Sequence, residues 1–273
     1  MNDLEQLKAV EINRKLLEKL QREVTTVKRE IKIMEVCGTH TQAISQLGLR
    51  ELLPANLDLL TGPGCPICVT PLSYIDTAIS LAQQEGIIIA TFADLLKVPG
   101  SDSTLELEQA RGQNIKTVYS PLDAVKIAQN NPQQEVVFLA VGFETTAPVI
   151  ALSILEAGNK KLNNYSLLQG LKTMPQVMEK LVLNQQLDLD GFLCPGHVAS
   201  IIGAEAFQFL AKQYDLPAVI AGFEAGDILL ALQQIMQMIV KQEAEMSNAY
   251  PRVVSEKGNR QALKVMDQVF SYT

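Results

Sequence analysis

From residue 31 to about residue 243, the chain alternates between short apolar runs and segments that open with helix start signals. A loop of small residues follows each run. The runs are Ile31–Val36, Leu57–Leu60, Gly86–Ala90, Thr117–Tyr119, Val136–Val141, Gly191–Leu193 and Ala218–Ala221. Strands that alternate with helices in this way form parallel sheets covered by helices, so the predicted fold class is α/β. The predicted helix caps are Thr39 with Gln42, Thr70-Pro71, Ser103 with Glu106, and Ser120-Pro121.

The organisation predicted from this pattern is two related, Rossmann-like α/β domains around a cleft. The tripeptide Gly-Phe-Glu follows an apolar run at 142–144 and again 80 residues later, which suggests duplication, although one repeated tripeptide can arise by chance. The polar stretch 130–134 is the best candidate boundary between the halves. The predicted divisions are an N-terminal helical segment 1–30, domain I 31–131, domain II 132–243 and a helical C-terminal tail 244–273.

Composition excludes several classes of function. The chain has 273 residues, a formal net charge of −7, 5% aromatic residues and no tryptophan. It therefore lacks the basic and aromatic surface that binds nucleic acids or anionic membranes. No apolar run approaches the ~18 residues of a membrane span, and the N-terminus mixes both charges at helical spacing. We expect a cytoplasmic protein whose cysteines are buried thiols, metal ligands or redox groups.

The strongest functional signal is the position of the four cysteines and two histidines of the chain. All six lie in loops that follow predicted strands, where open α/β sheets bind their ligands. These loops are 37–41 (CGTHT), 62–70 (GPGCPICVT) and 194–198 (CPGHV), and a fourth loop, 142–146 (GFETT), carries a glutamate and two threonines. Scattered residues would rarely gather in this way, so the pattern predicts a thiol-based metal or redox site.

Cys65 and Cys68 form a Cys-x-x-Cys pair just before a predicted helix. Two thiols at this spacing can close a small disulfide or chelate a metal, and a helix N-terminus favours the thiolate. Gly62 and Gly64 allow a backbone approach that a side chain would block. The alternative is a pair of buried structural cysteines in a tight turn.

Cys37 also follows a predicted strand, with His40 three residues later. Thiolate and imidazole are good ligands for iron or zinc, and His40 could instead accept the proton of Cys37. The structural alternative is a core cysteine with a capping histidine. Structural roles also fit the other loop residues, namely a turn for His197, packing for Cys194, dipole complementation for Glu144, and capping for Thr145 and Thr146.

Four motifs in order, MEVCGTHT (34–41), GPGCPICVT (62–70), GFETTAP (142–148) and PGHV (195–198), resemble those of the HypD family. The resemblance extends from about residue 10 to residue 260, and Val198-Ala199 stands where the family more often has Val-Ser. It implies an assembly scaffold in the maturation of nickel–iron hydrogenases rather than a conventional turnover enzyme. With the small chaperone HypC, such a scaffold holds an iron ion to which cyanide and CO are added. HypE, working with HypF, delivers the cyanide, and the hydrogenase large subunit receives the finished unit.

The resemblance also implies roles for individual residues. Cys37 would be the iron-ligating thiolate facing a cysteine of HypC, with His40 beside it as a second candidate metal ligand. Cys65 and Cys68 would be a redox dithiol that supplies electrons by cycling to a disulfide. The residues expected to line the cleft are Glu144, Thr145, Thr146 and His197. The expected cofactor-binding residues are Gly38, Thr39, Gly62 and Gly64.

The chain departs from the family toward its C-terminus. HypD proteins usually continue into a cysteine-rich domain that holds a four-iron–four-sulfur (4Fe–4S) cluster, whereas no cysteine follows Cys194 here. We therefore expect a shortened form, a fragment or half of a split gene, and we assign no such cluster to this chain.

Two alternatives come from other functional classes. Cys37 and His40, followed after 24 residues by Cys65 and Cys68, also have the spacing of a structural zinc site. The other alternative is a general thiol–disulfide oxidoreductase built on Cys65 and Cys68, which would turn over unrelated disulfides.

Overall fold

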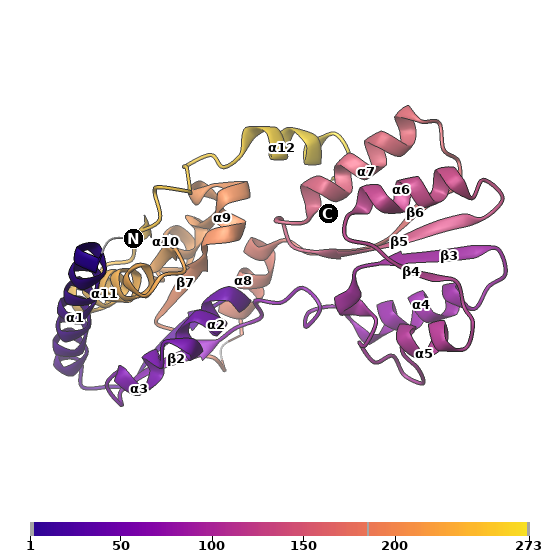
Figure 1. Cartoon of the computed structure of the whole chain (residues 1–273). Helices are drawn as coiled ribbons and strands as arrows, with labels where there is room; N and C mark the ends of the chain where they lie inside the picture. Colours follow the sequence, from indigo (N-terminus) through magenta and orange to yellow (C-terminus); the bar gives the residue numbers. More distant parts are fainter. Residues whose placement is uncertain (1–2, 185, 272–273) are drawn as a thin grey trace. The chain divides into compact units, whose positions relative to one another are not determined.

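The computed structural model describes residues 3–184 and 186–271 and divides the chain into two compact units (Figure 1). Unit 1 comprises residues 1–65 and 174–260, and unit 2 comprises residues 66–173 and 261–273. Each unit has its own parallel sheet, which confirms the predicted α/β class with a helix near each end of the chain. Within the described ranges, no helix has both the length and the apolar character needed to cross a membrane.

Unit 1 is built on a five-stranded parallel sheet with the order β2-β1-β7-β8-β9. Its strands are β1 (Ile31–Glu35), β2 (Leu57–Thr61), β7 (Gly191–Pro195), β8 (Ala218–Ala221) and β9 (Met246–Asn248). Its helices are α1 (Asp3–Thr26), α2 (Gly38–Gln46), α3 (Leu49–Leu52), α8 (Met174–Val182), α9 (Gly196–Ile202), η2 (Ala204–Phe207), α10 (Phe209–Tyr214) and α11 (Ala225–Lys241). The sheet therefore joins stretches that are far apart in the sequence.

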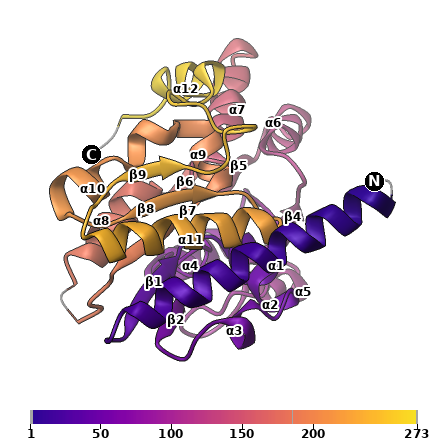
Figure 2. The same ribbon diagram turned by 90° about the vertical axis from the view of Figure 1, so that its left-hand side faces the viewer.

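Helices α1 and α11 lie side by side along the sheet of unit 1 (Figure 2). Leu20 and Val24 of α1 are fully buried and share one core cluster with Ile33 of β1 and Leu232 of α11. Burial of an aliphatic side chain of this size contributes about 1.5–3 kcal/mol. The predicted N-terminal helix is therefore part of the unit 1 core, and residues 1–2 of the predicted segment lie outside the described residues.

Asp190 fixes the pairing of β7 with β1 at the start of the two strands. Its carboxylate accepts a hydrogen bond from the Lys32 N–H at 2.8 Å and pairs with the Arg29 guanidinium at 2.5 Å. Its own N–H donates to the Lys32 carbonyl at 2.8 Å. The resulting register places Glu35 opposite Leu193, so the residues that follow β1 and β7 emerge at the same edge of the sheet.

Unit 2 is built on a four-stranded parallel sheet with the order β4-β3-β5-β6. Its strands are β3 (Ile87–Thr91), β4 (Ile115–Thr117), β5 (Glu135–Gly142) and β6 (Tyr165–Leu171). Its helices are α4 (Leu72–Ala82), η1 (Ala93–Leu95), α5 (Leu105–Ala110), α6 (Pro121–Asn130) and α7 (Ala147–Asn159), joined by most of α12 (Arg260–Asp267).

Helices cover both faces of the unit 2 sheet. Figure 1 shows α4 and α5 on one side of it and α6 and α7 on the other. Leu139 of β5 shares a core cluster with Ile75 of α4, whereas the preceding residue, Phe138, shares another with Ala124 of α6 and Ile150 of α7. Because successive side chains of a strand point to opposite faces, a strand buried on both sides is a continuous apolar run, as β5 is.

The two sheets have closely related strand orders. Numbered within its own unit, the order is 2-1-3-4-5 in unit 1 and 2-1-3-4 in unit 2. The order reverses between β1 and β7 in unit 1 and between β3 and β5 in unit 2, and open α/β sheets bind ligands at such switch points. The Gly-Phe-Glu tripeptides occur at the third strand of unit 2 (β5) and the fourth strand of unit 1 (β8). They therefore do not mark equivalent positions.

The contiguous domains predicted for residues 31–131 and 132–243 differ from the two observed units. Unit 1 takes β1 and β2 from the first predicted range and β7 and β8 from the second. The stretch 130–134, predicted as a boundary, lies inside unit 2 between α6 and β5. Parallel strands pair with partners at any distance along the chain, so composition alone does not show which strands share a sheet. The predicted tail, 244–273, contributes to both units.

Each predicted strand overlaps an observed one, and β6 and β9 are additional. Ser120 caps α6 as predicted, because its hydroxyl accepts a hydrogen bond from the Leu122 N–H, with Pro121 as the first helical residue. The prediction for α4 is wrong by one position, since Pro71 is its N-cap and Leu72 its first helical residue.

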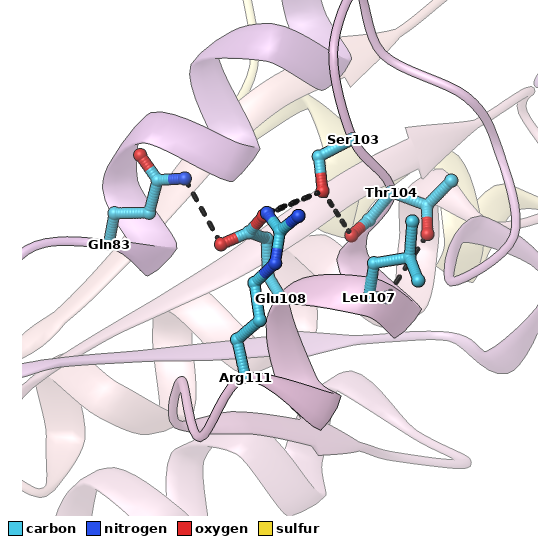
Figure 3. Close-up of polar contacts among 6 residues, drawn as sticks. All are labelled: Gln83, Ser103, Thr104, Leu107, Glu108 and Arg111. Carbon is cyan, nitrogen blue, oxygen red and sulfur yellow. Dashed lines mark hydrogen bonds and ion pairs between the residues drawn. The ribbon is translucent and has the colours of Figure 1, made fainter.

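A buried carboxylate at the end of α5 connects several segments of unit 2 (Figure 3). Glu108 accepts hydrogen bonds from the Ser103 hydroxyl at 2.6 Å, the Gln83 amide at 3.0 Å and the Arg111 guanidinium at 2.6 Å. Thr104, rather than the predicted Ser103, caps α5, and the Ser103 hydroxyl binds Glu108 instead. The hydrogen bond from Ser103, followed by that from Gln83, lowers the pKa of Glu108 below its ordinary value although burial raises it.

The substitution Glu108→Gln should lower the free energy of unfolding at pH 7 by about 2 kcal/mol, because charged hydrogen bonds to Ser103, Gln83 and Arg111 are lost. The folded-state pKa lies below the unfolded-state value, so this stabilisation is full above the unfolded-state pKa and disappears as the pH falls through the folded-state pKa. The wild type should therefore lose more stability on acidification below about pH 5 than the variant does. Urea denaturation followed by circular dichroism measures both effects.

Glu106→Gln is the matched control, because Glu106 is exposed on the same helix. It should leave both the stability and its pH dependence unchanged. A Glu108→Gln protein as stable as the wild type at pH 7 would show that the network is not stabilising.

Candidate functional site

The loops after β1 and β7 begin at the switch point of the unit 1 sheet. Cys37 lies two residues beyond the end of β1, and His197 lies two residues beyond the end of β7. Because Glu35 and Leu193 are opposite each other near the ends of these neighbouring strands, both loops leave from one edge of the sheet. The fold thus brings two predicted site residues from distant parts of the sequence to the edge where such sheets bind ligands.

Cys37 is the N-cap residue of α2, and 8% of it is exposed. Its burial raises the pKa of its thiol above the ordinary value, and the charge of Glu35 adds to this effect. The backbone N–H groups of His40 and Thr39 and the Thr39 hydroxyl act in the opposite direction, because they stabilise the thiolate. Thr39, predicted as a helix cap, therefore lies inside α2 and interacts with the thiol.

Glu35, the last residue of β1, is fully buried and hydrogen-bonds to the Cys37 turn. One carboxylate oxygen accepts a hydrogen bond from the Cys37 N–H at 3.0 Å, and the other accepts one from the Thr41 hydroxyl at 2.5 Å. Glu35 was not among the predicted site residues, although it lies within the motif at 34–41. Its signal is an acidic side chain at the end of an apolar strand, two residues before a cysteine.

His40 is fully buried and lies within hydrogen-bond distance of the backbone between β8 and α11. Its Nε2 is 2.9 Å from the Gly222 carbonyl oxygen. A carbonyl only accepts, so Nε2 carries the proton and donates, which leaves Nδ1 as the basic nitrogen. Nδ1 is buried and has no hydrogen-bond partner among the described residues. Burial lowers the pKa of His40 to about 4, so the ring is uncharged at neutral pH.

Phe223 contacts both histidines of the chain. Its ring centroid is 4.7 Å from that of His40, at an interplanar angle of 34°, and 4.0 Å from that of His197, at 25°. His197 is exposed, and partial desolvation lowers its pKa below the ordinary value. Both predicted histidines therefore contact the ring of Phe223, which was not among the predicted site residues although it belongs to the second Gly-Phe-Glu tripeptide.

Two glycines bring the segment before Cys65 against the Cys37 turn. A Cβ at Gly64 would lie 2.4 Å from the Gly38 nitrogen and 2.6 Å from the Cys37 Cα. A Cβ at Gly62 would lie 2.8 Å from the Glu35 carbonyl oxygen, which accepts a hydrogen bond from the Gly62 N–H at 2.7 Å. A side chain at either position would displace one of these backbones. Gly38 is under no such constraint, because the nearest atom to a Cβ added there would be the Gly64 carbonyl oxygen, 3.8 Å away.

The Cys-x-x-Cys pair spans the point at which the chain passes from unit 1 to unit 2. Cys65 is the last residue of the first stretch of unit 1, and Pro66 is the first residue of unit 2. Cys65 is half-buried and Cys68 is exposed, and no disulfide joins cysteines in the described part of the chain. After the pair, the Thr70 hydroxyl donates to the Pro66 carbonyl at 2.9 Å, which closes the turn that leads to α4.

The remaining predicted residues, Glu144, Thr145 and Thr146, follow β5 at the switch point of the unit 2 sheet. Glu144 is buried, with 3% of it exposed, whereas Thr145 is exposed. Thr146 is the N-cap of α7, but its side chain makes no capping hydrogen bond. The Thr146 side chain instead packs on Gly142: a Cβ added at Gly142 would lie 2.7 Å from the Thr146 Cβ.

Among the described residues, no three histidine, cysteine, aspartate or glutamate side chains are grouped as ligands of a metal ion. Cys37, His40 and Cys65 of unit 1 therefore do not form a preassembled zinc site in this structure. Cys37 and His40 remain a pair of candidate donors at the switch point.

Comparison with known proteins identifies the family. A model described as "HypD: Hydrogenase formation hypA family" matches residues 11–273. The chain belongs to the HypD family. It is 41% identical over 263 residues to a hydrogenase expression/formation protein of Methanocaldococcus jannaschii, covering 96% of this chain and 71% of that protein. It is 40% identical over 245 residues to the hydrogenase maturation factors HypD of Escherichia coli and of Rhodobacter capsulatus, covering 90% of this chain in both cases.

The chain spans 66% of the length of the Escherichia coli HypD and 65% of that of the Rhodobacter capsulatus HypD. Among solved structures, one similar chain is an ABC domain in complex with L-Trp from Streptococcus pneumonia, covering 88% of this chain and 95% of that one. Its TM-score of 0.18 at 10% identity does not indicate a shared fold. Membership of the HypD family therefore depends on the sequence matches alone.

The environments of the four thiols predict their order of reactivity. At pH 7.5 a small alkylating reagent should modify the exposed Cys68 first and the half-buried Cys65 next. The thiolate is the reactive form, and burial limits the access of the reagent to it. Cys37 and the fully buried Cys194 should react much more slowly, since burial raises the pKa of both thiols. The rate at Cys37 should still be rising above about pH 9. Mass spectrometry of timed samples gives the four rates.

The control is the same reaction in urea, where all four cysteines should react at similar rates. Modification of Cys37 as fast as Cys68 in the native protein would contradict the buried, protonated state of the Cys37 thiol.

Proposed function

We propose that this chain is a scaffold in hydrogenase maturation, on which Cys37 holds an iron ion while cyanide and CO ligands are added. The iron is the cargo of the assembly rather than a resident cofactor. The observation that carries the proposal is the environment of the Cys37 thiol, which is buried at the switch point and faces N–H and O–H donors from Thr39 and His40.

The Cys37 thiol suits a cation that arrives and later leaves. Burial and the Glu35 charge keep it protonated when no cation is present. Coordination to iron(II) would displace the proton, because a metal-bound thiol is deprotonated. The donors from Thr39 and His40 would then stabilise the sulfur anion, and the Glu35 carboxylate would attract the cation. Thiolate is also a suitable anchor for low-spin iron that carries strong-field cyanide and CO ligands.

His40 is the second candidate ligand, through Nδ1. This nitrogen keeps its lone pair because Nε2 donates to the Gly222 carbonyl. A buried polar atom without a partner costs about 1–3 kcal/mol, which a bound cation would offset. His40 is fully buried, so iron could bind it only in the interior of the protein, beneath the Cys37 turn.

Cys65 and Cys68 would supply electrons to the assembly. Closing one disulfide from two thiols releases two electrons and two protons. Because Cys68 is exposed, a partner can reach the disulfide and reduce it again. Cys65 directly follows Gly64, which contacts the backbone of the Cys37 turn.

The partners in this proposal follow from family membership. HypC would contribute a cysteine that faces Cys37, HypE working with HypF would deliver cyanide, and the hydrogenase large subunit would receive the finished unit. His197 of unit 1 is proposed to face the growing ligand set. Glu144, Thr145 and Thr146, at the switch point of the unit 2 sheet, are proposed as further site residues. We place this assembly in the cytoplasm, where thiols are kept reduced.

The iron–sulfur cluster expected of full-length HypD proteins does not fit the residues described here. Such a cluster needs four cysteine ligands, and the chain has four cysteines in all, of which Cys194 is fully buried at the end of β7. The described cysteines do not form a ligand group either. No step of the proposed function therefore uses a cluster in this chain.

The exposure of Cys68 also favours a second candidate, a general thiol–disulfide oxidoreductase. That activity would reduce or oxidise unrelated disulfides and would depend on Cys65 and Cys68 but not on Cys37. The scaffold function requires Cys37 and no turnover on unrelated disulfides, so Cys37→Ala and Cys65→Ser distinguish the two.

The direct test is anaerobic co-purification of the chain with HypC, in cells that contain the cyanide-delivering proteins, followed by infrared spectroscopy and iron analysis. The complex should show metal–cyanide and metal–carbonyl stretching bands and bound iron. Cys37→Ala should abolish both, because the anchoring thiolate is lost. Cys194→Ala is the matched control: it removes a thiol of the same unit from the core and should leave the bands in place.

Bands of equal intensity in wild type and Cys37→Ala would contradict the role of Cys37. A complex with HypC that shows neither bands nor iron in the wild type would contradict the proposal that this chain holds the ligated iron.

A further inference from the structure

Both histidines of the chain contact one aromatic ring, that of Phe223: His197 stacks on it, and His40 meets it at a tilt. His40 lies in the first turn of α2, after β1, His197 lies in the first turn of α9, after β7, and Phe223 lies in the loop after β8. Phe223 therefore connects three neighbouring strand ends of the unit 1 sheet at its switch point. We propose that Phe223 is a positioning residue that holds the imidazoles of His40 and His197 in fixed orientations at the Cys37 end of this sheet.

The backbone next to Phe223 acts on His40 directly. The Gly222 carbonyl accepts the hydrogen bond from His40 Nε2 at 2.9 Å, so the same dipeptide sets the tautomer of His40 and stacks on its ring. Without this acceptor either tautomer of a buried imidazole could form, and the basic nitrogen would not be fixed. The Gly222-Phe223 segment thus determines both which nitrogen of His40 is basic and which way the ring faces.

An ion pair between the buried Asp227 and the exposed Arg252 holds the Gly222-Phe223 segment in place. Asp227, in the first turn of α11, binds the Arg252 guanidinium through both carboxylate oxygens at 2.8 and 2.5 Å. It also accepts a hydrogen bond from the Glu224 N–H at 3.4 Å. A Cβ at Gly222 would lie only 2.1 Å from an Asp227 oxygen, so the carboxylate packs directly on the Gly222 backbone.

The Phe223 ring is supported at its edge as well. Tyr250 meets it in a T-shaped contact at 6.1 Å and 81°, and the Arg252 guanidinium lies over the Tyr250 ring at 4.5 Å. At Gly196, just before His197, an added Cβ would be 3.4 Å from the Phe223 Cζ. The ring is therefore fitted closely between Tyr250 and the start of α9. A side chain without a rigid plane would not reproduce these contacts.

The consequence for function depends on the proposed role of Cys37. His197 is the exposed member of the set and the one that can meet a ligand, and stacking removes part of its water. An oriented, uncharged imidazole at this edge can accept a proton when the thiol gives one up on binding a cation. Phe223 would then act on the site through His197 and His40 without touching iron itself.

The test uses the fact that the chain has two histidines, so NMR of the histidine-labelled protein gives two sets of ring signals. In the folded wild type both sets should show upfield ring-current shifts and cross-relaxation to Phe223 protons. This measurement needs no variant. Ring protons of His197 at random-coil positions, with no contact to Phe223, would overturn the proposal.

The variant Phe223→Leu should return the His197 signals toward random-coil positions and raise the pKa of His197 toward its ordinary value, because less of the ring is desolvated. The matched control is Phe209→Leu, which removes a half-buried ring of unit 1 that contacts Tyr214 rather than a histidine. It should change neither histidine. Equal pH titrations of His197 in wild type and Phe223→Leu, or equal effects of the two variants, would show that Phe223 is only a packing residue.

The infrared experiment on the complex with HypC separates this inference from the proposed function. If Phe223 positions the histidines of an iron site, Phe223→Leu should weaken the metal–cyanide bands at least several-fold while Phe209→Leu keeps them. Histidine signals that respond to Phe223→Leu in a protein without such bands would support the positioning role and overturn the proposed function. Bands of wild-type intensity in Phe223→Leu would overturn the link between Phe223 and the iron site.

Discussion

The candidate site of unit 1 depends on the pairing of β1 with β7. These strands come from distant parts of the chain, and Asp190 fixes their register through the Lys32 backbone and the Arg29 guanidinium. The pairing places the Cys37 turn and the start of α9, which carries His197, after neighbouring strands at the edge where the strand order reverses. A shift of register by one residue would move every side chain of β7 to the other face of the sheet and would displace the start of α9 from the Cys37 turn.

At this edge the side chains are arranged so that the thiol and both imidazoles are uncharged at neutral pH. Burial disfavours the charged forms of Cys37 and His40, while the Glu35 carboxylate is held by hydrogen bonds from the Cys37 N–H and the Thr41 hydroxyl. A buried carboxylate beside a protonated thiol favours a cation over an anion. The arrangement is therefore suited to a transient metal cargo, which is the role that we propose for a member of the HypD family.

Local features of the sequence predicted most of the fold. Strands such as β5 are buried on both faces and form unbroken apolar runs, and Ser120-Pro121 is a cap that depends on adjacent residues only. The edge strand β6 was missed because every side chain in it is half-buried or exposed, the one buried residue being Gly170, so no apolar run marks it. The assignment of strands to two sheets could not be predicted, since it depends on pairing between distant segments.

For the proposed site, the sequence indicated candidate residues but not how they are held. The motifs located Cys37, His40 and His197, whereas the supporting groups have ordinary local surroundings. Glu35 ends an apolar strand, and Phe223 follows another in a tripeptide that occurs twice. Their roles arise from contacts with residues far away in the chain, such as that of the Gly222 carbonyl with His40.

The central claim is that the Cys37 sulfur binds the iron. Iron K-edge X-ray absorption on the anaerobically loaded complex with HypC tests it most directly, because sulfur neighbours of iron are resolved by distance and number. The account predicts a sulfur shell at about 2.3 Å, as is typical of metal–thiolate bonds, that loses one scatterer in Cys37→Ala and none in Cys194→Ala. An unchanged sulfur shell in Cys37→Ala would show that iron is held elsewhere and would contradict the account.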